Sequence, residues 1–120
     1  HVLFKEIDKD NAVTMSVTAI QLIRNHIGFK GVLLSDDLSM QALDGSLKHR
    51  TEGALAAGCD VALHCNGKMI EMVQVASGGL PLSTEAIKRV ERAENIRLQN
   101  RVPFECKFDD QVQRLKAMMT

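Results

Sequence analysis

The chain has 120 residues, and its fifteen basic and fifteen acidic side chains give a formal net charge of zero. Trp and Tyr are absent and only four Phe occur, so the composition argues against binding to nucleic acid or to an anionic membrane. The longest apolar runs are far shorter than the roughly 20 residues of a membrane span, and the first residues lack the layout of a signal peptide.

The three cysteines, Cys59, Cys65 and Cys106, have no CxxC spacing and are odd in number. This pattern predicts reduced thiols and therefore a cytoplasmic protein. The length suits one domain with one core, but a closed α/β barrel typically needs about 250 residues. Because the chain begins at His1 and not at Met, we expect further sequence upstream.

In the first third of the chain, a helix is predicted between two strand-like segments. Residues 1–4 are apolar after the first position and are predicted to be the end of a strand. A helix is predicted to begin after Ser16 and to end at Gly28, because apolar residues recur between them at three- and four-residue steps. A short apolar strand follows and ends in two adjacent carboxylates, Asp36 and Asp37.

The next segment repeats this arrangement. A helix over 47–57 is predicted after Ser46 and before Gly58, a strand follows over 60–64, and another amphipathic helix covers 69–76. Two consecutive helix and strand units with short links predict parallel neighbouring strands. The fold class is therefore α/β with two to three parallel strands, typical of the back part of a larger barrel or sheet, and an exposed sheet edge is expected.

The last third is predicted to be helical. Ser83 precedes a long charged helix over 84–100, Pro103 is predicted to break it, and a final helix covers 108–118.

Polar residues at the predicted strand ends are the candidates for chemistry, because catalytic groups of α/β barrels lie where the strands end. Asp36 and Asp37 come first, although alternation along the strand does not choose between them, and both could instead cap the turn that follows. Further pocket candidates are Met40, His64, Asn66 and His1, and a polar strand end that faces solvent is the alternative for His64 and Asn66.

Two other polar groups are assigned different roles. Asp60 opens its strand at the opposite end, where a cap or an ion pair is expected. A metal site formed by His1, Asp36, Asp37 and His64 is disfavoured, since no compact ligand motif such as HExxH is present, and no metal is predicted.

Two sequence blocks carry a resemblance to a known family. The block GFKGVLLSDDLSM over 28–40, followed by AAGCDVALHCN over 56–66, resembles bacterial β-N-acetylhexosaminidases of glycoside hydrolase family 3. The resemblance covers about residues 1–100, and its members are (β/α)8 barrels that remove β-linked N-acetylglucosamine by a retaining mechanism, in cytoplasmic peptidoglycan recycling. It implies that residues 1–100 are the C-terminal units of a glycosidase barrel and that 101–120 form a helical extension.

The resemblance also implies roles for individual residues. Asp36 corresponds to the catalytic nucleophile and Asp37 to a neighbour, the partner is an N-acetylglucosamine-containing glycan or muropeptide, and no cofactor is implied. The family places its acid/base group on a His, oriented by an Asp, in a mobile upstream loop, and the associated Lys-His-Phe-Pro-Gly-His-type segment is absent from these 120 residues. The chain alone is therefore expected to be inactive.

Two alternatives to this interpretation stay open at the level of sequence. The chain could be a non-catalytic α/β module that self-associates by pairing its exposed strand edges with another copy. A weaker alternative is a different barrel enzyme in which the strand-end acid acts as a base on a carbonyl substrate.

Overall fold

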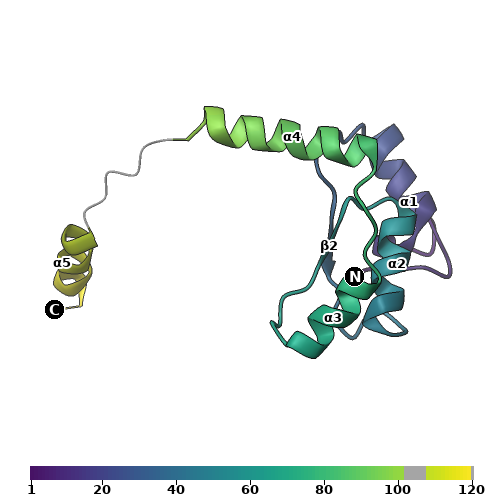
Figure 1. Cartoon of the computed structure of the whole chain (residues 1–120), viewed down its shortest axis with the longest axis horizontal. Helices are drawn as coiled ribbons and strands as arrows, with labels where there is room; N and C mark the ends of the chain where they lie inside the picture. The colour runs from purple at the N-terminus through teal and green to yellow at the C-terminus, as the bar shows by residue number, and fades with distance from the viewer. Residues whose placement is uncertain (102–107, 120) are drawn as a thin grey trace.

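The protein contains a small parallel sheet packed against helices, with one long helix projecting from this body (Figure 1). The structure is a computed structural model that describes residues 1–101 and 108–119. Strands β1 (Leu34–Asp37) and β2 (Val61–Leu63) pair in parallel. The helical elements are η1 (Val13–Met15), α1 (Val17–Gln21), η2 (Leu22–His26), α2 (Leu47–Ala57), α3 (Met69–Ser77), α4 (Thr84–Gln99) and α5 (Phe108–Met118).

The helix boundaries follow local signals in the sequence. A serine hydroxyl accepts a backbone N–H at the start of three helices: Ser16 at 3.1 Å for α1, Ser46 at 3.3 Å for α2 and Ser83 at 3.1 Å for α4. Gly58 ends α2 with φ of 113°, a conformation that favours glycine. These boundaries confirm the predicted helices, whereas the predicted break at Pro103 lies outside the described residues.

One sequence-based expectation is wrong. Residues 1–4 form no strand, because their carbonyls bond to nearby turns: Val2 O accepts from Val13 N and Phe4 O accepts from Ile7 N. The helical segment after Ser16 ends just before Gly28, whose φ is 76°, as predicted, but its second half widens into the π-helical turn η2. Within η2, Arg24 donates to the carbonyls of Phe29 and Gly31, and this holds the turn against the segment that enters β1.

The core lies between α2, α1 and the sheet. One cluster contains Ile20, Ala57 and Cys59, and the other contains Leu38, Leu43 and Ala54. The small residues of α2 allow close packing, and so does Gly78 at the end of α3, where a Cβ would lie 2.5 Å from the Lys48 carbonyl oxygen. The described core is therefore held mainly by contacts of α2 with its neighbours.

The sheet has open edges. In the described part of the chain only β1 and β2 pair, so each strand has one outer edge without a strand neighbour. On α3, Met69 and Ile70 are 70% and 74% exposed. The predicted two to three strands are thus two among the described residues, and the expected exposed edge is present. No helix in these residues is both long and apolar enough to cross a membrane.

Candidate active site

Asp36 lies at the carboxyl end of β1, next to an irregularity in the strand pairing. Leu34 pairs with Val61 and Asp37 with Leu63, so three steps along β1 match two steps along β2. The hydroxyl of Ser35 accepts a hydrogen bond from Leu63 N at 2.9 Å, in place of a backbone carbonyl. Such a bulge re-aims a side chain, and the Asp36 side chain is 58% exposed.

The two oxygens of Asp36 have different surroundings. Oδ1 accepts a hydrogen bond from Asp37 N at 2.8 Å, which fixes the rotation of the carboxylate. Oδ2 lies 3.5 Å from the backbone nitrogen of His1. The carboxylate is therefore oriented by the backbone and still accessible to a ligand.

Asp37 is used in a different way, because both of its oxygens accept hydrogen bonds from the protein. Oδ1 accepts from Ser39 N at 3.0 Å and from Cys65 N at 3.2 Å, and Oδ2 accepts from Ser39 Oγ at 2.7 Å. The hydroxyl of Ser39 contributes most to lowering the pKa of Asp37 below its ordinary value. The turn-capping alternative thus describes Asp37, which joins the turn after β1 to the segment after β2.

His1 lies beside these two carboxylates. Its ring is buried, with Nε2 at 2.8 Å from the Asp37 carbonyl oxygen and Nδ1 at 2.8 Å from Thr14 Oγ1. Because a carbonyl only accepts, Nε2 is the donor in the first contact. His1 therefore holds the backbone at the end of β1 and does not project its ring into solvent.

His64 is buried between two acidic side chains. Its side chain is 5% exposed, and its ring nitrogens lie 3.8 Å from Asp37 Oδ1 and 3.6 Å from Glu71 Oε2. Neither nitrogen makes a hydrogen bond within the described residues. The alternative of a solvent-facing residue is therefore wrong for His64, which lies between the ends of β1 and β2 and the start of α3.

Asn66 links the end of β2 to α3. Its amide donates to Glu71 Oε2, and its carbonyl oxygen accepts from Lys68 N at 2.9 Å, just before α3 begins. The hydrogen bond from Asn66 is the main cause of the lowered pKa of Glu71. Asn66 itself is exposed.

Met40 is 42% exposed, and its backbone has the clearer structural role. Arg50 Nη1, from α2, donates to the carbonyls of Leu38 and Met40 at 2.9 Å each. The Arg50 guanidinium therefore holds the backbone of the loop after β1, while the Met40 side chain stays partly exposed to solvent.

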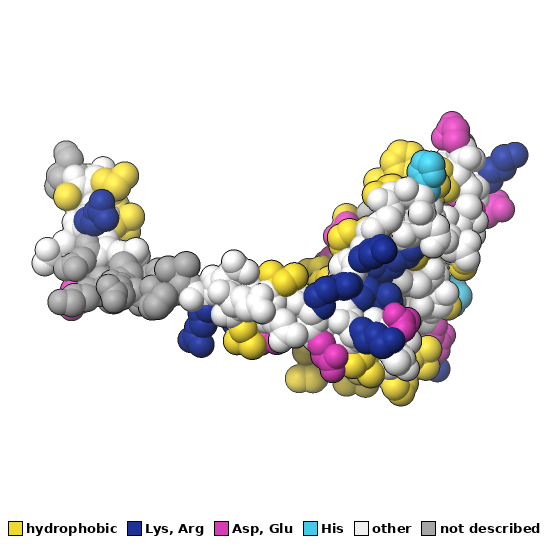
Figure 2. All heavy atoms as spheres, turned by 90° about the horizontal axis from the view of Figure 1, so that it is seen from above, with side chains coloured by type: hydrophobic (Ala, Val, Ile, Leu, Met, Phe, Trp, Pro, Cys, Tyr) yellow, Lys and Arg dark blue, Asp and Glu magenta, His cyan; other side chains and the backbone are white. Residues whose placement is uncertain are grey.

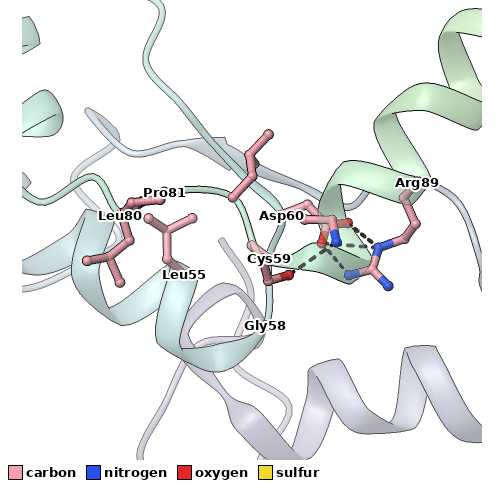
Figure 3. A pocket seen from close by; sticks show the side chains of 10 residues that line it. Leu55, Gly58, Cys59, Asp60, Leu80, Pro81 and Arg89 are labelled. Carbon is pink, nitrogen blue, oxygen red and sulfur yellow. Dashed lines mark hydrogen bonds and ion pairs between the residues drawn. The ribbon is translucent and has the colours of Figure 1, made fainter.

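Ion pairs surround Asp60 at the opposite end of the sheet, as predicted, and Figure 3 shows the pair with Arg89. Its carboxylate accepts from Arg24 Nη2 at 2.7 Å, from Arg89 Nη2 at 2.7 Å and from Leu33 N at 2.9 Å. Burial alone raises the pKa of Asp60, but the hydrogen bonds from Arg89, Leu33 and Arg24 outweigh it and hold the pKa below its ordinary value.

Sequence reasoning missed three residues that shape the strand ends. Ser35 replaces a ladder carbonyl, Arg50 holds the following loop, and Glu71 lies against His64. Glu71 had a detectable signal, because an acidic residue in the first turn of a predicted helix lies close to the strand that precedes it. The other two depend on contacts between segments and carry no local signal.

The profile of the glycosyl hydrolase family 3 N-terminal domain matches residues 1–98, which include all six predicted site residues. The chain belongs to glycosyl hydrolase family 3. A β-hexosaminidase of Nitrosomonas eutropha is 46% identical over 68 residues, which are 55% of this chain and 20% of that protein. A β-hexosaminidase of Idiomarina loihiensis is 38% identical over 95 residues, 77% of this chain and 28% of that protein.

Another β-hexosaminidase, from Neisseria meningitidis, is 41% identical over 68 residues and is covered to 19% of its length. The chain thus spans about a fifth to just over a quarter of the length of the curated family 3 relatives that it matches. Its family membership confirms the resemblance drawn from the two sequence blocks. The assignment of residues 1–100 to the C-terminal units of a barrel stays a prediction.

Proposed function

We propose that this chain carries the nucleophile of a retaining glycoside hydrolase that removes terminal β-linked N-acetylglucosamine, and that the nucleophile is Asp36. Family membership and β-hexosaminidase relatives support the reaction class. The observation that carries the choice of residue is the contrast at the end of β1. Asp36 is exposed and keeps an accessible oxygen, whereas Asp37 uses both oxygens in protein contacts.

The proposed reaction has two steps. The Asp36 carboxylate attacks the anomeric carbon, the bond to the leaving oxygen breaks, and that oxygen takes a proton from an acid outside these 120 residues. Water then displaces Asp36 from the glycosyl intermediate with help from the same group as a base, which gives N-acetylglucosamine and the free carboxylate. An ionised carboxylate needs no activating base for the first step.

The remaining parts of the proposal follow from the family resemblance. The substrate is a muropeptide or another glycan with terminal N-acetylglucosamine, the setting is cytoplasmic peptidoglycan recycling, and the domain is part of a (β/α)8 barrel. In this proposal the pocket is stabilised by contacts that join the ends of β1 and β2, and these contacts involve Asp37, His64 and Asn66.

The test uses the full-length enzyme that contains these residues and an aryl β-N-acetylglucosaminide. Asp36→Ala is expected to lower kcat by several orders of magnitude, because the covalent step is lost. Added azide, which fits the space left by the carboxylate, is expected to restore aryl release and to give the α-configured glycosyl azide.

The matched control is Asp44→Ala, which removes an exposed carboxylate from the loop that follows β1. This variant is expected to keep wild-type kcat. An Asp36→Ala enzyme with wild-type kcat, or one that gives only β-configured azide, would contradict the assignment.

A second candidate function is self-association of a non-catalytic module, which the open outer edges of β1 and β2 favour. It predicts that the 120-residue chain forms dimers or larger species whose fraction grows with concentration in sedimentation velocity. A chain that stays monomeric over the whole concentration range would contradict this alternative.

A further inference from the structure

A basic cleft lies at the end of the sheet opposite to Asp36. It has a volume of about 330 Å³ and is formed by η2, by the link into β1 and by the first half of α4. Five of its lining residues are basic: Arg24, Lys30, Lys88, Arg89 and Arg92. Figure 2 shows Lys and Arg side chains gathered where the long helix meets the body of the molecule.

Two of the five cations are fixed in place by Asp60. Arg24 and Arg89 both donate to this carboxylate at 2.7 Å, and their side chains are only 17% and 21% exposed. Arg24 is held further by the carbonyl of Gly31 at 2.7 Å. A binding group held by the protein in this way loses little conformational entropy when a ligand arrives.

The other cations keep donors that the protein does not use. Arg92 donates through Nη2 to the Lys30 carbonyl, and its Nε and Nη1 make no hydrogen bond in the part of the chain that the structure describes. The same holds for Arg89 Nη1 and for the Lys30 ammonium. Lys88 pairs with Glu85, but both side chains are about two-thirds exposed, so that pair is weak.

The charge of the cleft and its free donors indicate which class of ligand it would bind. Five cations in and around the cleft face two carboxylates, Asp60 and Glu85, so the cleft has a local excess of positive charge although the chain is neutral overall. Guanidinium and ammonium N–H donors that the protein leaves free can donate to the oxygens of a phosphoryl group. We propose that this cleft binds a small, multiply charged anion of the phosphate or phosphate-ester class.

The cleft fits a small anion better than a nucleic acid. Its volume is at the lower end for small-molecule sites. One face of the Phe29 ring, which could stack on a base, is taken by the Arg24 guanidinium, whose carbon lies 5.7 Å from the ring centroid. The site is separate from the proposed glycosidase centre, because β1 runs from this end of the sheet to Asp36 at the other.

The test measures binding of inorganic phosphate, pyrophosphate and a hexose phosphate to the 120-residue chain by amide chemical-shift titration at physiological ionic strength. Saturable shifts confined to residues around the cleft are expected. The variant Lys30→Gln/Arg92→Gln spares the ion pairs of Asp60, and it is expected to weaken binding by at least roughly tenfold, since each lost contact to a charged group is worth about that factor.

The control is Arg97→Ala, which removes one cation from the same helix but outside the cleft, where Arg97 pairs with Glu94 and is 62% exposed. It is expected to keep the wild-type affinity. Tighter binding of the hexose phosphate than of inorganic phosphate identifies an ester as the ligand, and the reverse order identifies free phosphate. The proposal is overturned if no probe saturates, or if Arg97→Ala weakens binding as much as the double variant does.

Discussion

At the scale of single residues, Asp36 and Asp37 show how two identical neighbours acquire different roles. Their sequence context is the same apolar strand end, and local alternation gave no reason to choose between them. The structure distinguishes them through Ser35, whose hydroxyl bonds to Leu63 N across the sheet. A contact between segments 28 residues apart has no local signature, and so the position of the bulge could not be predicted.

Asp8 offers a test of a single carboxylate. It accepts hydrogen bonds from Ser16 Oγ at 2.6 Å and from the backbone N–H groups of Asp10 and Asn11 at 3.0 Å each, which lower its pKa from 3.8 to about 2. Below pH 3.8 the unfolded chain takes up this proton and the folded chain does not, so stability falls as the pH drops toward 2.

Urea unfolding between pH 5 and pH 2 checks this prediction, with Asp8→Asn expected to show a flatter decline in unfolding free energy than wild type. Asp10→Asn is the matched control, because its carboxylate makes no hydrogen bond in the described structure, and it is expected to follow the wild-type curve. Identical slopes for wild type and Asp8→Asn would contradict the assignment.

At the scale of elements, the sequence predicted the helix boundaries that depend on local signals such as caps. The serine caps and Gly58 placed the boundaries of α2 and α4 correctly to within about a residue. The strand predicted over 60–64 is shorter in the structure, at Val61–Leu63. The π-helical turn of η2 was also missed, since it accompanies contacts that Arg24 makes with the Gly31 carbonyl and with the carboxylate of Asp60, 36 residues away.

Asp60 is expected to hold α4 against the body. It bonds to Arg89 of α4, to Arg24 of η2 and to the backbone before β1, and its side chain is only 3% exposed. Asp60→Ala leaves two guanidinium groups without their carboxylate, which is expected to lower the unfolding free energy by about 3 kcal/mol. Faster amide hydrogen exchange in α4 should accompany this loss.

Arg97→Ala is the control for this variant, because it removes an exposed ion pair near the far end of α4. It is expected to change stability by no more than about 0.5 kcal/mol. If Asp60→Ala leaves both stability and the exchange of α4 unchanged, the ion pairs are not what holds the helix.

The thiols report on packing of the helix that enters β2. Cys59 is 7% exposed, and burial is the main cause that raises its pKa to about 11, whereas Cys65 is exposed. In a Cys106→Ser variant, the exposed thiol of Cys65 is expected to react rapidly with Ellman's reagent at pH 8, and the buried thiol of Cys59 only after unfolding. Rapid reaction of both thiols in the absence of denaturant would mean that the cluster around Ile20 is not packed as described.

At the scale of the whole molecule, the chain is more extended than a compact domain of its length. Its radius of gyration is 18.9 Å, against about 14 Å expected for a compact globule. Large apolar side chains on α3 and α4 are exposed, among them Ile70 and Ile96. This surface is consistent with the proposal that the fold is part of a larger barrel.

The proposed mechanism leads to a prediction for the chain alone. It holds Asp36 but no Lys-His-Phe-Pro-Gly-His-type segment, and the proposed mechanism places the acid/base group in that segment. The 120-residue chain is expected to release aryl groups from N-acetylglucosaminides no faster than buffer does, in a continuous absorbance assay. Turnover that Asp36→Ala abolishes would show that the chain supplies its own acid.

The irregular pairing of β1 also determines which of the side chains after the bulge face the core and which face solvent. In a regular strand, side chains two apart share a face, so the exposed Leu34 would be followed outward by Asp36 and then Leu38. The extra residue shifts this phase by one, and Leu38 is instead fully buried. A deletion of Ser35 would therefore remove the extra residue and restore regular pairing: Leu38, then three positions after Leu34, would stay buried, whereas Asp36 would take the inward position of Ser35.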